Sequence, residues 1–285
     1  MGDATLRARL GELTRARRLR GSPAPTEAAV PEPARRRPGG MDAPEAGGAP
    51  AALRDERVGV EAFLPGGEWR GPKGAVFVHE CLRSQVERPR PNWGRLEAPP
   101  PREREIEALA RLGLEHALFL DLETCGLASS AVFLAGTMQW NGSDFVLRQY
   151  FARHYGEEAA LLAALGEGMR GAEYLITFNG KSYDAPFLGA RALVHGVDLR
   201  LPPRHLDLLH PARRRWRREL PDCRLQTLEA RVCRRRRYGD VPGDEVPGLY
   251  HDYVRHGDAY RLVPVFHHNL LDVITMAEIM RALCA

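Results

Sequence analysis

The chain has 285 residues, 44% of them hydrophobic, and a formal net charge of +4. No apolar run approaches the roughly 20 residues that cross a bilayer, which argues against a membrane-spanning protein. The first residues lack the apolar core of a secretory signal, and the five cysteines include no Cys-x-x-Cys pair. A disulfide framework or a zinc site is therefore not expected, and we expect a soluble protein of the reducing cytoplasm.

Residues 1–57 are expected to be largely disordered. Residues 20–50 are rich in Ala, Pro, Gly and Arg and show no hydrophobic period, which is typical of a linker. Before them, Leu6, Leu10 and Leu13 recur at helical spacing. They could form an amphipathic helix that docks on a partner, but so short a helix is marginal by itself, and we favour the marginal reading.

Deleting residues 20–50 should leave the activity and the melting temperature of the protein nearly unchanged, because their composition offers no apolar face to bury. Thermal unfolding of the full chain and of the deletion variant checks this. A large loss of stability would mean that the segment docks on the core.

Residues 58–100 are expected to form a small strand-rich extension and a connector. Two strand-like pieces, 59–64 and 75–81, are separated by glycines and a proline, and 89–101 is proline-rich and extended. A helix is predicted over 103–113, ending at a glycine.

Residues 101–285 are expected to form the main domain, with an apolar strand at 117–122 and a hairpin of 131–138 and 145–151 around Asn141-Gly142. Helices then alternate with short strands. The predicted helices are 157–169, 185–195, 224–233, 246–256 and 259–283, and the strands are 174–178 and 205–209. This order predicts an α/β fold with a mixed sheet flanked by helices.

Acidic residues stand at apolar edges in three blocks of this domain. Asp121 and Glu123 are two apart on a predicted strand, so both carboxylates project to one side. Asp184 follows an apolar strand and opens a helix. It could be an ordinary helix cap, or it could point over the carboxyl edge of the sheet, where α/β proteins often bind ligands.

The third block lies on the last predicted helix. His268 and Asp272 are four apart and share a helix face. A neutral histidine near a metal-bound water can act as a general base, although a surface His–Asp pair would give the same pattern. His267 lies five residues before Asp272 and would point elsewhere.

Together the blocks resemble those of the DEDD 3′–5′ exonuclease superfamily and, more closely, the YprB-like ribonuclease H-like domain family. The resemblance covers about residues 115–284. It rests on Phe119-Leu-Asp-Leu-Glu-Thr124, Phe178-Asn-Gly-Lys-Ser-Tyr-Asp184, His205-Leu-Asp-Leu-Leu-His-Pro-Ala-Arg213, Cys223-Arg-Leu-Gln-Thr-Leu-Glu229, Asp240-Val-Pro-Gly-Asp-Glu-Val-Pro247 and His268-Asn-Leu-Leu-Asp272. It implies a ribonuclease H-like fold with a mixed five-stranded sheet.

The resemblance also implies the roles of individual residues. Two Mg²⁺ or Mn²⁺ ions would be bound by four carboxylates, those of Asp121, Glu123, Asp184 and Asp272. The terminal nucleotide site would be lined by Thr124, Gly126 and Leu127. Superfamily members carry either Tyr-x-x-x-Asp or His-x-x-x-x-Asp in the third block, and this chain offers His268 at the first spacing and His267 at the second. We choose His268 as the general base. Cys125 stands where related sequences usually have threonine, which should alter local packing only.

The arginines are concentrated late in the chain. Residues 213–218 and 234–237 are basic clusters that would track phosphates or form solvated surface, and both interpretations stay open. We assign Asn179, Lys181 and Arg213 to substrate binding.

The predicted function is metal-dependent 3′–5′ exonuclease action on single-stranded DNA or RNA, giving nucleoside 5′-monophosphates by a two-metal mechanism. The alternative is a nucleic-acid-binding module with the same fold and little or no catalysis. A cluster of anions beside phosphate favours the enzyme, because without metal it would repel the ligand.

Overall fold

The computed structural model describes residues 58–87, 103–126, 130–237 and 239–284. The expectations for residues 1–57, for the connector beyond residue 87 and for Leu127 lie outside these ranges.

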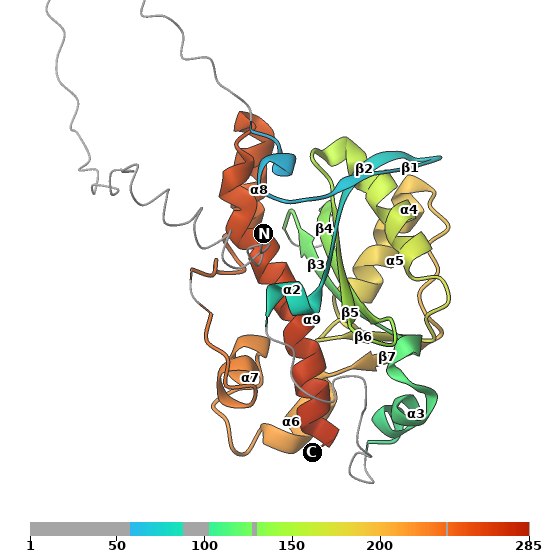
Figure 1. Ribbon diagram of the computed structural model, residues 1–285, viewed down its shortest axis with the longest axis vertical. Coiled ribbons are helices and arrows are strands. Elements are labelled where there is room, and N and C mark those ends of the chain that lie inside the picture. Colours follow the sequence, from blue (N-terminus) through green and yellow to red (C-terminus); the bar gives the residue numbers. More distant parts are fainter. Residues whose placement is uncertain (1–57, 88–102, 127–129, 238, 285) are drawn as a thin grey trace, which may run out of the picture.

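One mixed sheet of seven strands organises the described chain, in the order β1-β2-β5-β4-β3-β6-β7 (Figure 1). The strands are β1 (Gly67–Gly71), β2 (Gly74–Leu82), β3 (Ala117–Thr124), β4 (Val132–Trp140), β5 (Phe145–Phe151), β6 (Tyr174–Thr177) and β7 (Arg204–Asp207). β3 is antiparallel to β4 and parallel to β6. The last five strands are those expected for the main domain, and β1 and β2 extend the same sheet through β5.

Helices pack on both faces of this sheet. The α-helices are α2 (Arg83–Val86), α3 (Arg104–Leu112), α4 (Glu158–Gly168), α5 (Asp184–His195), α6 (Leu209–Trp216), α7 (Leu225–Arg231), α8 (Val246–His256) and α9 (Val263–Cys284). Short 3-10 helices are η1 (Val60–Ala62), η2 (Leu114–His116), η3 (Tyr155–Glu157) and η4 (Ala259–Leu262). The predicted α/β class, with a mixed sheet flanked by helices, is confirmed.

The predicted strand at 59–64 is wrong. The segment contains the 3-10 helix η1, because its buried side chains recur at helical rather than alternating spacing: Val60, Phe63 and Leu64 all lie inside the core. The first strand is β1 instead, in a glycine-rich stretch where no strand was predicted. Its register against β2 places Trp69 opposite Val76.

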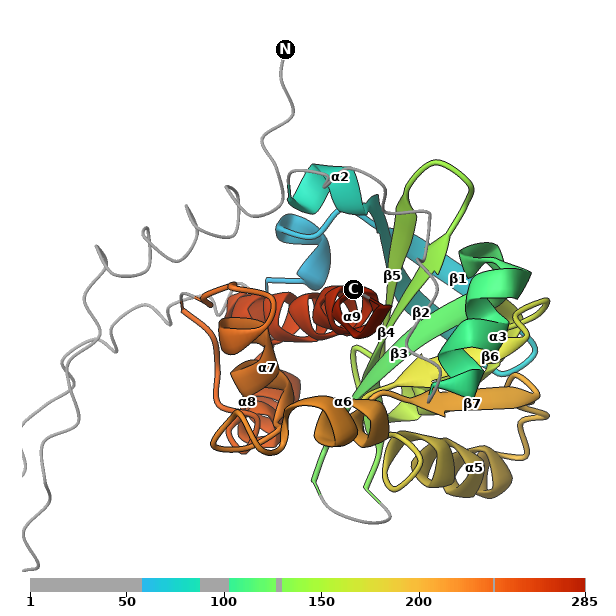
Figure 2. The same cartoon turned by 90° about the horizontal axis from the view of Figure 1, so that it is seen from below.

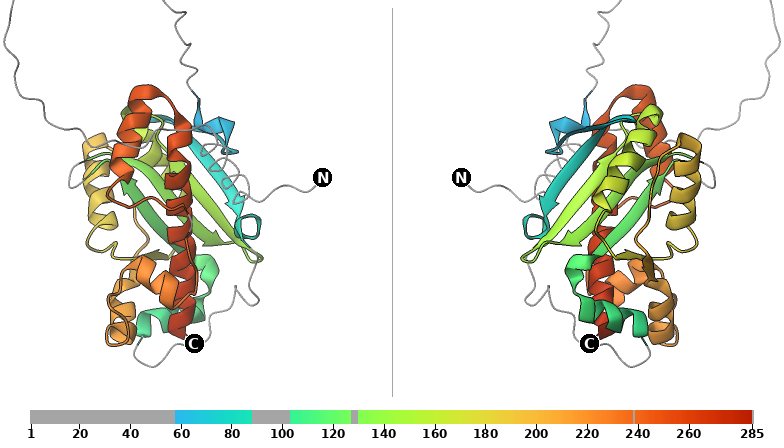
Figure 3. Two further views of the ribbon diagram at one scale, coloured as in Figure 1. Left: turned by 90° about the vertical axis from the view of Figure 1, so that its left-hand side faces the viewer. Right: turned by 90° about the vertical axis from the view of Figure 1, so that its right-hand side faces the viewer.

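α9 crosses one face of the sheet, and α4 covers the other (Figures 1 and 3). Seen along α9, helices α7 and α8 lie beside it (Figure 2). The core on the α9 face includes Phe119, whereas Leu118 and Leu120 belong to the core under α4. Successive residues of β3 therefore face opposite layers, as strand geometry requires.

α9 is a 22-residue helix that is buried on almost every side. A surface helix would show one apolar stripe, so burial all round marks a central element. Its buried polar residues are therefore the informative ones: His268, Asn269, Asp272, Thr275 and Glu278. Despite its apolar character, α9 does not qualify as a membrane span, and neither does any other helix among the described residues.

Candidate active site

β3 carries the first two carboxylates to the face of the sheet that α9 covers. Asp121 and Glu123 follow Phe119 at intervals of two, so they share its face. Asn269 of α9 donates a hydrogen bond to Oδ2 of Asp121 at 2.9 Å. The register of β3 against β4 shifts after Glu123, so the strand becomes irregular directly beyond the second carboxylate.

Asp184 is brought to the same place by the turn between β6 and α5. Asn179 in this turn has a positive φ of 67°. The backbone N–H groups of Asn179 and Lys181 donate to the carboxylate of Asp207 at 2.8 and 3.1 Å. At Gly180, an added Cβ would lie 2.4 Å from the Thr177 hydroxyl oxygen, so only glycine fits. The turn is thus fixed, and α5 begins at Asp184.

α9 carries the remaining two predicted site residues, His268 and Asp272, one helical turn apart. His268 Nε2 lies 3.4 Å from Oδ2 of Asp272, and Nδ1 of the same ring lies 2.8 Å from Oδ1 of Asp240. Arg237, which lies between α7 and α8 in the sequence, forms ion pairs with Asp272 and with Glu229. His268 rather than His267 therefore faces the carboxylates.

The four carboxyl groups influence one another strongly. Burial and neighbouring charges raise the pKa of Asp121 well above its usual range. Burial is also the main reason why the pKa of Glu123 rises to about 8 and that of Asp184 to about 7. The charge of Asp272 adds to the increase in all three. Carboxylates from three separate segments are thus close enough to repel each other at one edge of the sheet.

This donor set suits a hard divalent cation, because carboxylate oxygens are the ligands that Mg²⁺ and Mn²⁺ prefer and a cation would offset the repulsion. The side chains as they stand do not enclose an ion. Among the described residues, no group of three or more His, Cys, Asp or Glu side chains could hold a metal. Asp272 is paired with Arg237 instead. The set fits in chemistry and location, and we expect Asp272 to move away from Arg237 when an ion binds.

The charge state of His268 follows from its neighbours. Burial alone would lower its pKa, but the hydrogen bond to Asp240 and the charges of Asp272 and Glu123 raise it to about 9. In this arrangement the imidazole is protonated at neutral pH. It can accept a proton from water only when the charges that raise its pKa are compensated.

In the presence of EDTA, the free energy of unfolding should fall as the pH rises from about 5 to about 8. The pKa of Glu123 is raised from 4.5 to about 8, so the folded state holds more protons than the unfolded state across this window. Urea unfolding at several pH values measures the slope. Glu123→Gln removes the titrating group, so its curve should be flatter than that of the wild type; parallel curves would contradict the proposed electrostatics.

The predicted substrate residues are placed as follows. Thr124 ends β3, and its hydroxyl donates to the carbonyl oxygen of Gly126 at 2.8 Å. Asn179 and Lys181 lie in the turn before Asp184, and the Lys181 side chain is exposed. Arg213 is exposed on α6, and no described interaction joins it to the four carboxylates. Leu127 lies outside the described ranges.

Two arginines of the basic cluster 234–237 fit neither of the two interpretations left open for that cluster. Within the 234–237 cluster, the side chains of Arg235 and Arg237 are only 13% and 7% exposed and lie in ion pairs. Arg235 pairs with Glu87 and Glu278, so it joins the extension to α9. These two arginines stabilise buried carboxylates and do not form a free basic surface.

Four residues of the site carried too little sequence signal to be found. Asp207 lies in one of the motifs of the resemblance, which gives it no role, and Arg237 belongs to the basic cluster 234–237, for which the sequence leaves two interpretations open. The others are Asp240 and Asn269. Each acts through a partner distant in sequence, so spacing alone does not reveal it. Only Asp207 carried a usable signal for a role in the site, because it is a carboxylate at the end of a short strand and is buried.

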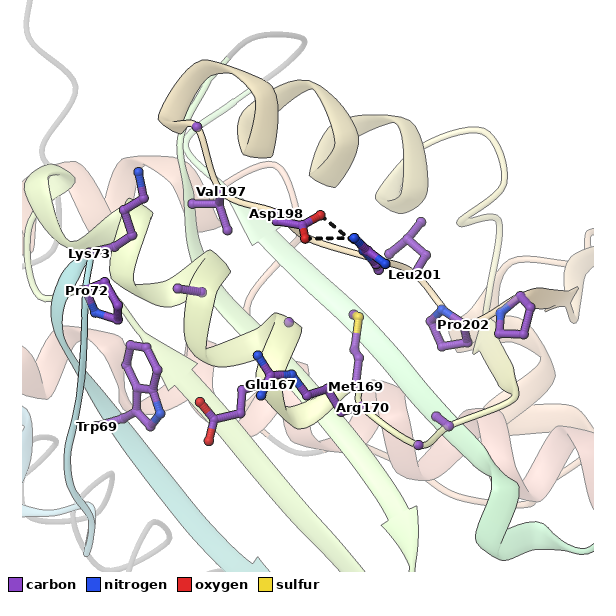
Figure 4. Close-up of a pocket in the computed structure, with 17 residues that line it drawn as sticks. Trp69, Pro72, Lys73, Glu167, Met169, Arg170, Val197, Asp198, Leu201 and Pro202 are labelled. Atoms are coloured by element: carbon purple, nitrogen blue, oxygen red, sulfur yellow. Dashed lines mark hydrogen bonds and ion pairs between the residues drawn. The ribbon is translucent and has the colours of Figure 1, made fainter.

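A cavity of about 590 Å³ lies elsewhere, between the β1–β2 turn, the end of α4 and residues 196–203 (Figure 4). Trp69, Met169 and Leu201 line it, together with charged side chains such as Arg170 and Asp198. None of the four carboxylates contributes to it. The cavity is therefore not the place where the predicted chemistry would occur.

Comparison with known proteins gives two related findings and one weak likeness. The RNase H superfamily model matches residues 118–284. The uncharacterized protein YprB of Bacillus subtilis (strain 168) is 31% identical in an alignment of 234 positions that covers 76% of this chain and 56% of that protein. The chain thus spans little more than half of that relative.

Among solved structures, the family B DNA polymerase of the hyperthermophilic archaeon Pyrobaculum calidifontis matches with a TM-score of 0.47 and 15% identity. The match covers 57% of this chain and 23% of the polymerase. Similarity at this level is too small to support an inference.

Proposed function

Because the chain belongs to the RNase H superfamily, we propose that it is a metal-dependent 3′–5′ exonuclease that hydrolyses single-stranded nucleic acid to nucleoside 5′-monophosphates. The observation that carries the proposal is the group of four mutually repelling carboxyl groups beside the buried polar face of α9. They come from segments about 150 residues apart, and a fold needs no such cluster for its stability.

The proposed metal ligands are Asp121, Glu123, Asp184 and Asp272. A pair of Mg²⁺ or Mn²⁺ ions held there would supply an activated water and stabilise the leaving oxygen. His268 is the proposed proton acceptor, and Asp240 orients its ring through the hydrogen bond to Nδ1. The pKa of His268 should fall towards its ordinary value once the negative charge around it is compensated.

The remaining predicted residues would hold the strand. Thr124, Gly126 and Leu127 are proposed to receive the terminal nucleotide. Lys181 lies in the turn before Asp184, and its side chain is exposed. Its ammonium group can therefore reach a phosphate while its backbone N–H keeps the hydrogen bond to Asp207. Asn179 and Arg213 complete the proposed phosphate contacts.

The activity is tested with 5′-end-labelled single strands of DNA and RNA of one sequence, incubated with Mn²⁺ or with EDTA. The proposal predicts a ladder of products that shorten from the 3′ end, with nucleoside 5′-monophosphate released, only when Mn²⁺ is present. Asp121→Ala, purified in parallel, should give no ladder.

Binding of the strands without cleavage would favour the alternative, a nucleic-acid-binding module. Equal cleavage by wild type and Asp121→Ala would identify a contaminating nuclease. A single internal cut in place of a ladder would exclude exonuclease action.

A further inference from the structure

A row of residues crosses four strands of the sheet on the face towards α9. In the register of the strands, His79 of β2 lies opposite Gln149 of β5, Gln149 opposite Gly136 of β4, and Gly136 opposite Asp121 of β3. The row thus begins in the N-terminal extension and ends at a proposed metal ligand. Gly136 is the one position in it without a side chain.

Asn269 of α9 fills the space above Gly136. A Cβ added at Gly136 would lie 2.2 Å from Oδ1 of Asn269, and that contact excludes any other residue unless Asn269 moves. Asn269 is completely buried. The glycine therefore lets α9 place an amide group between Gln149 and Asp121, at the level of the strands.

The hydrogen bonds define the orientation of this amide. Nδ2 of Asn269 donates to Oδ2 of Asp121 at 2.9 Å and lies 3.3 Å from the backbone oxygen of the same residue. Oδ1 of Asn269 accepts from Nε2 of Gln149 at 3.0 Å, and Nε2 also donates to the Phe266 carbonyl at 2.8 Å. A backbone carbonyl can only accept, so the Phe266 oxygen fixes the direction of the Gln149 amide. The Asn269 amide must then present its oxygen to Gln149 and its N–H group to Asp121.

In this arrangement the amide oxygen of Gln149, Oε1, is buried and is left without a hydrogen-bond partner among the described residues. A buried amide that leaves its own acceptor unpaired is rare in folded proteins. The orientation of the Gln149 amide is therefore determined by the hydrogen bonds that its Nε2 donates to Asn269 and to the Phe266 carbonyl on α9.

We propose that Asn269, supported by Gln149 and by the absence of a side chain at Gly136, is a positioning residue that holds the carboxylate of Asp121 in place for metal binding. The inference rests on the proposed function, since it assigns a role within the same site. Asn269 touches neither substrate nor metal in this account. It fixes Oδ2 of Asp121 through a hydrogen bond whose donor is held by α9 and whose acceptor is held by the sheet.

The test measures Mn²⁺ affinity by electron paramagnetic resonance of the free ion, without nucleic acid. Asn269→Leu keeps the volume and removes the amide, and it should weaken Mn²⁺ binding by about 10- to 100-fold, the range for residues that orient a metal ligand. Turnover of a labelled strand should fall similarly, while KM for the strand stays within about twofold. Gln149→Met, which removes only the donor behind Asn269, should give a smaller loss in the same direction.

Gly136→Ala supplies an independent probe, because the added methyl group must displace Asn269. It should weaken Mn²⁺ binding by itself but have little further effect in the presence of Asn269→Ser, whose shorter side chain leaves room. Such non-additivity identifies a direct coupling. Thr137→Val is the matched control: Thr137 is buried on the same strand and faces the opposite layer, so Mn²⁺ affinity should not change.

The outcomes separate the inference from the proposed function. If the wild type binds no Mn²⁺, the proposed function fails. If the wild type binds Mn²⁺ and all three variants, Asn269→Leu, Gln149→Met and Gly136→Ala, bind it within twofold of the wild type, the positioning role is wrong and the function stands. Thermal unfolding identifies a variant that does not fold, in which case the other variants decide.

Discussion

Replacing Asp121 with alanine should lower exonuclease turnover by more than about 10³-fold. A catalytic cation contributes several kcal/mol to the transition state, and about 1.4 kcal/mol corresponds to a factor of ten in rate. Asp121 is central to the site because the charges of Asp272, Glu123 and Asp184 all act on it. Single-turnover hydrolysis of a labelled strand in Mn²⁺ measures the loss.

The control for this substitution is Asp198→Ala. Asp198 lies on the surface with its side chain 78% exposed and pairs only with Arg200 in the described structure. Its loss should leave turnover within about twofold of the wild type, because an exposed ion pair contributes little. A rate for Asp121→Ala that is lower than the wild-type rate but still within tenfold of it would rule out Asp121 as an essential ligand.

Replacing His268 with alanine should lower turnover by roughly 10²- to 10⁴-fold, the usual range for a general base. Affinity for the strand should change little, because the imidazole faces Asp240 and Asp272 and not the surface. Asp272→Asn should behave differently, since it weakens metal binding, and added Mn²⁺ should partly restore its activity. The rates and the Mn²⁺ dependence of the two variants are measured side by side.

His267→Ala is the matched control for this experiment, because His267 precedes His268 on the same helix. It should keep nearly full activity. If His268→Ala has the wild-type rate, either His267 is the base or the measured nuclease is a contaminant. The double variant His267→Ala/His268→Ala decides between them, and activity that survives in it would contradict the enzymatic proposal.

The parts of the site that depend on local periodicity could be predicted from the sequence. Alternation along a strand places Asp121 and Glu123 on one face, and helical spacing places His268 beside Asp272. The structure shows both relations, since the charge of Glu123 acts on Asp121 and His268 lies 3.4 Å from Asp272. That the three blocks would meet did not follow from any spacing. It came from their order along the chain and from the resemblance to a known family.

The parts that depend on tertiary contact could not be predicted. Arg237 lies in a loop without hydrophobic period, and its partners Glu229 and Asp272 are 8 and 35 residues away. An arginine run of this kind is usually solvated or bound to phosphate, and nothing in its spacing indicates buried carboxylate partners. The sequence gives no reason for a glycine at position 136 within a strand, and the reason is visible only when Asn269 of α9 lies above it.

The error at 59–64 has a similar origin. Val60, Phe63 and Leu64 read as strand residues when taken as a short apolar run, and periodicity cannot separate the two states over so few positions. Their burial against α8 and α9 selects the 3-10 helix. Short segments of this kind take their conformation from the surface that they cover.

Crystals of the protein grown with Mn²⁺ would test the central claim most directly, through the anomalous scattering of the metal. The account predicts two peaks bounded by the carboxylates of Asp121, Glu123, Asp184 and Asp272, with Asp272 no longer paired to Arg237. Absence of a peak at these residues at saturating Mn²⁺, with the Arg237–Asp272 ion pair intact, would contradict it.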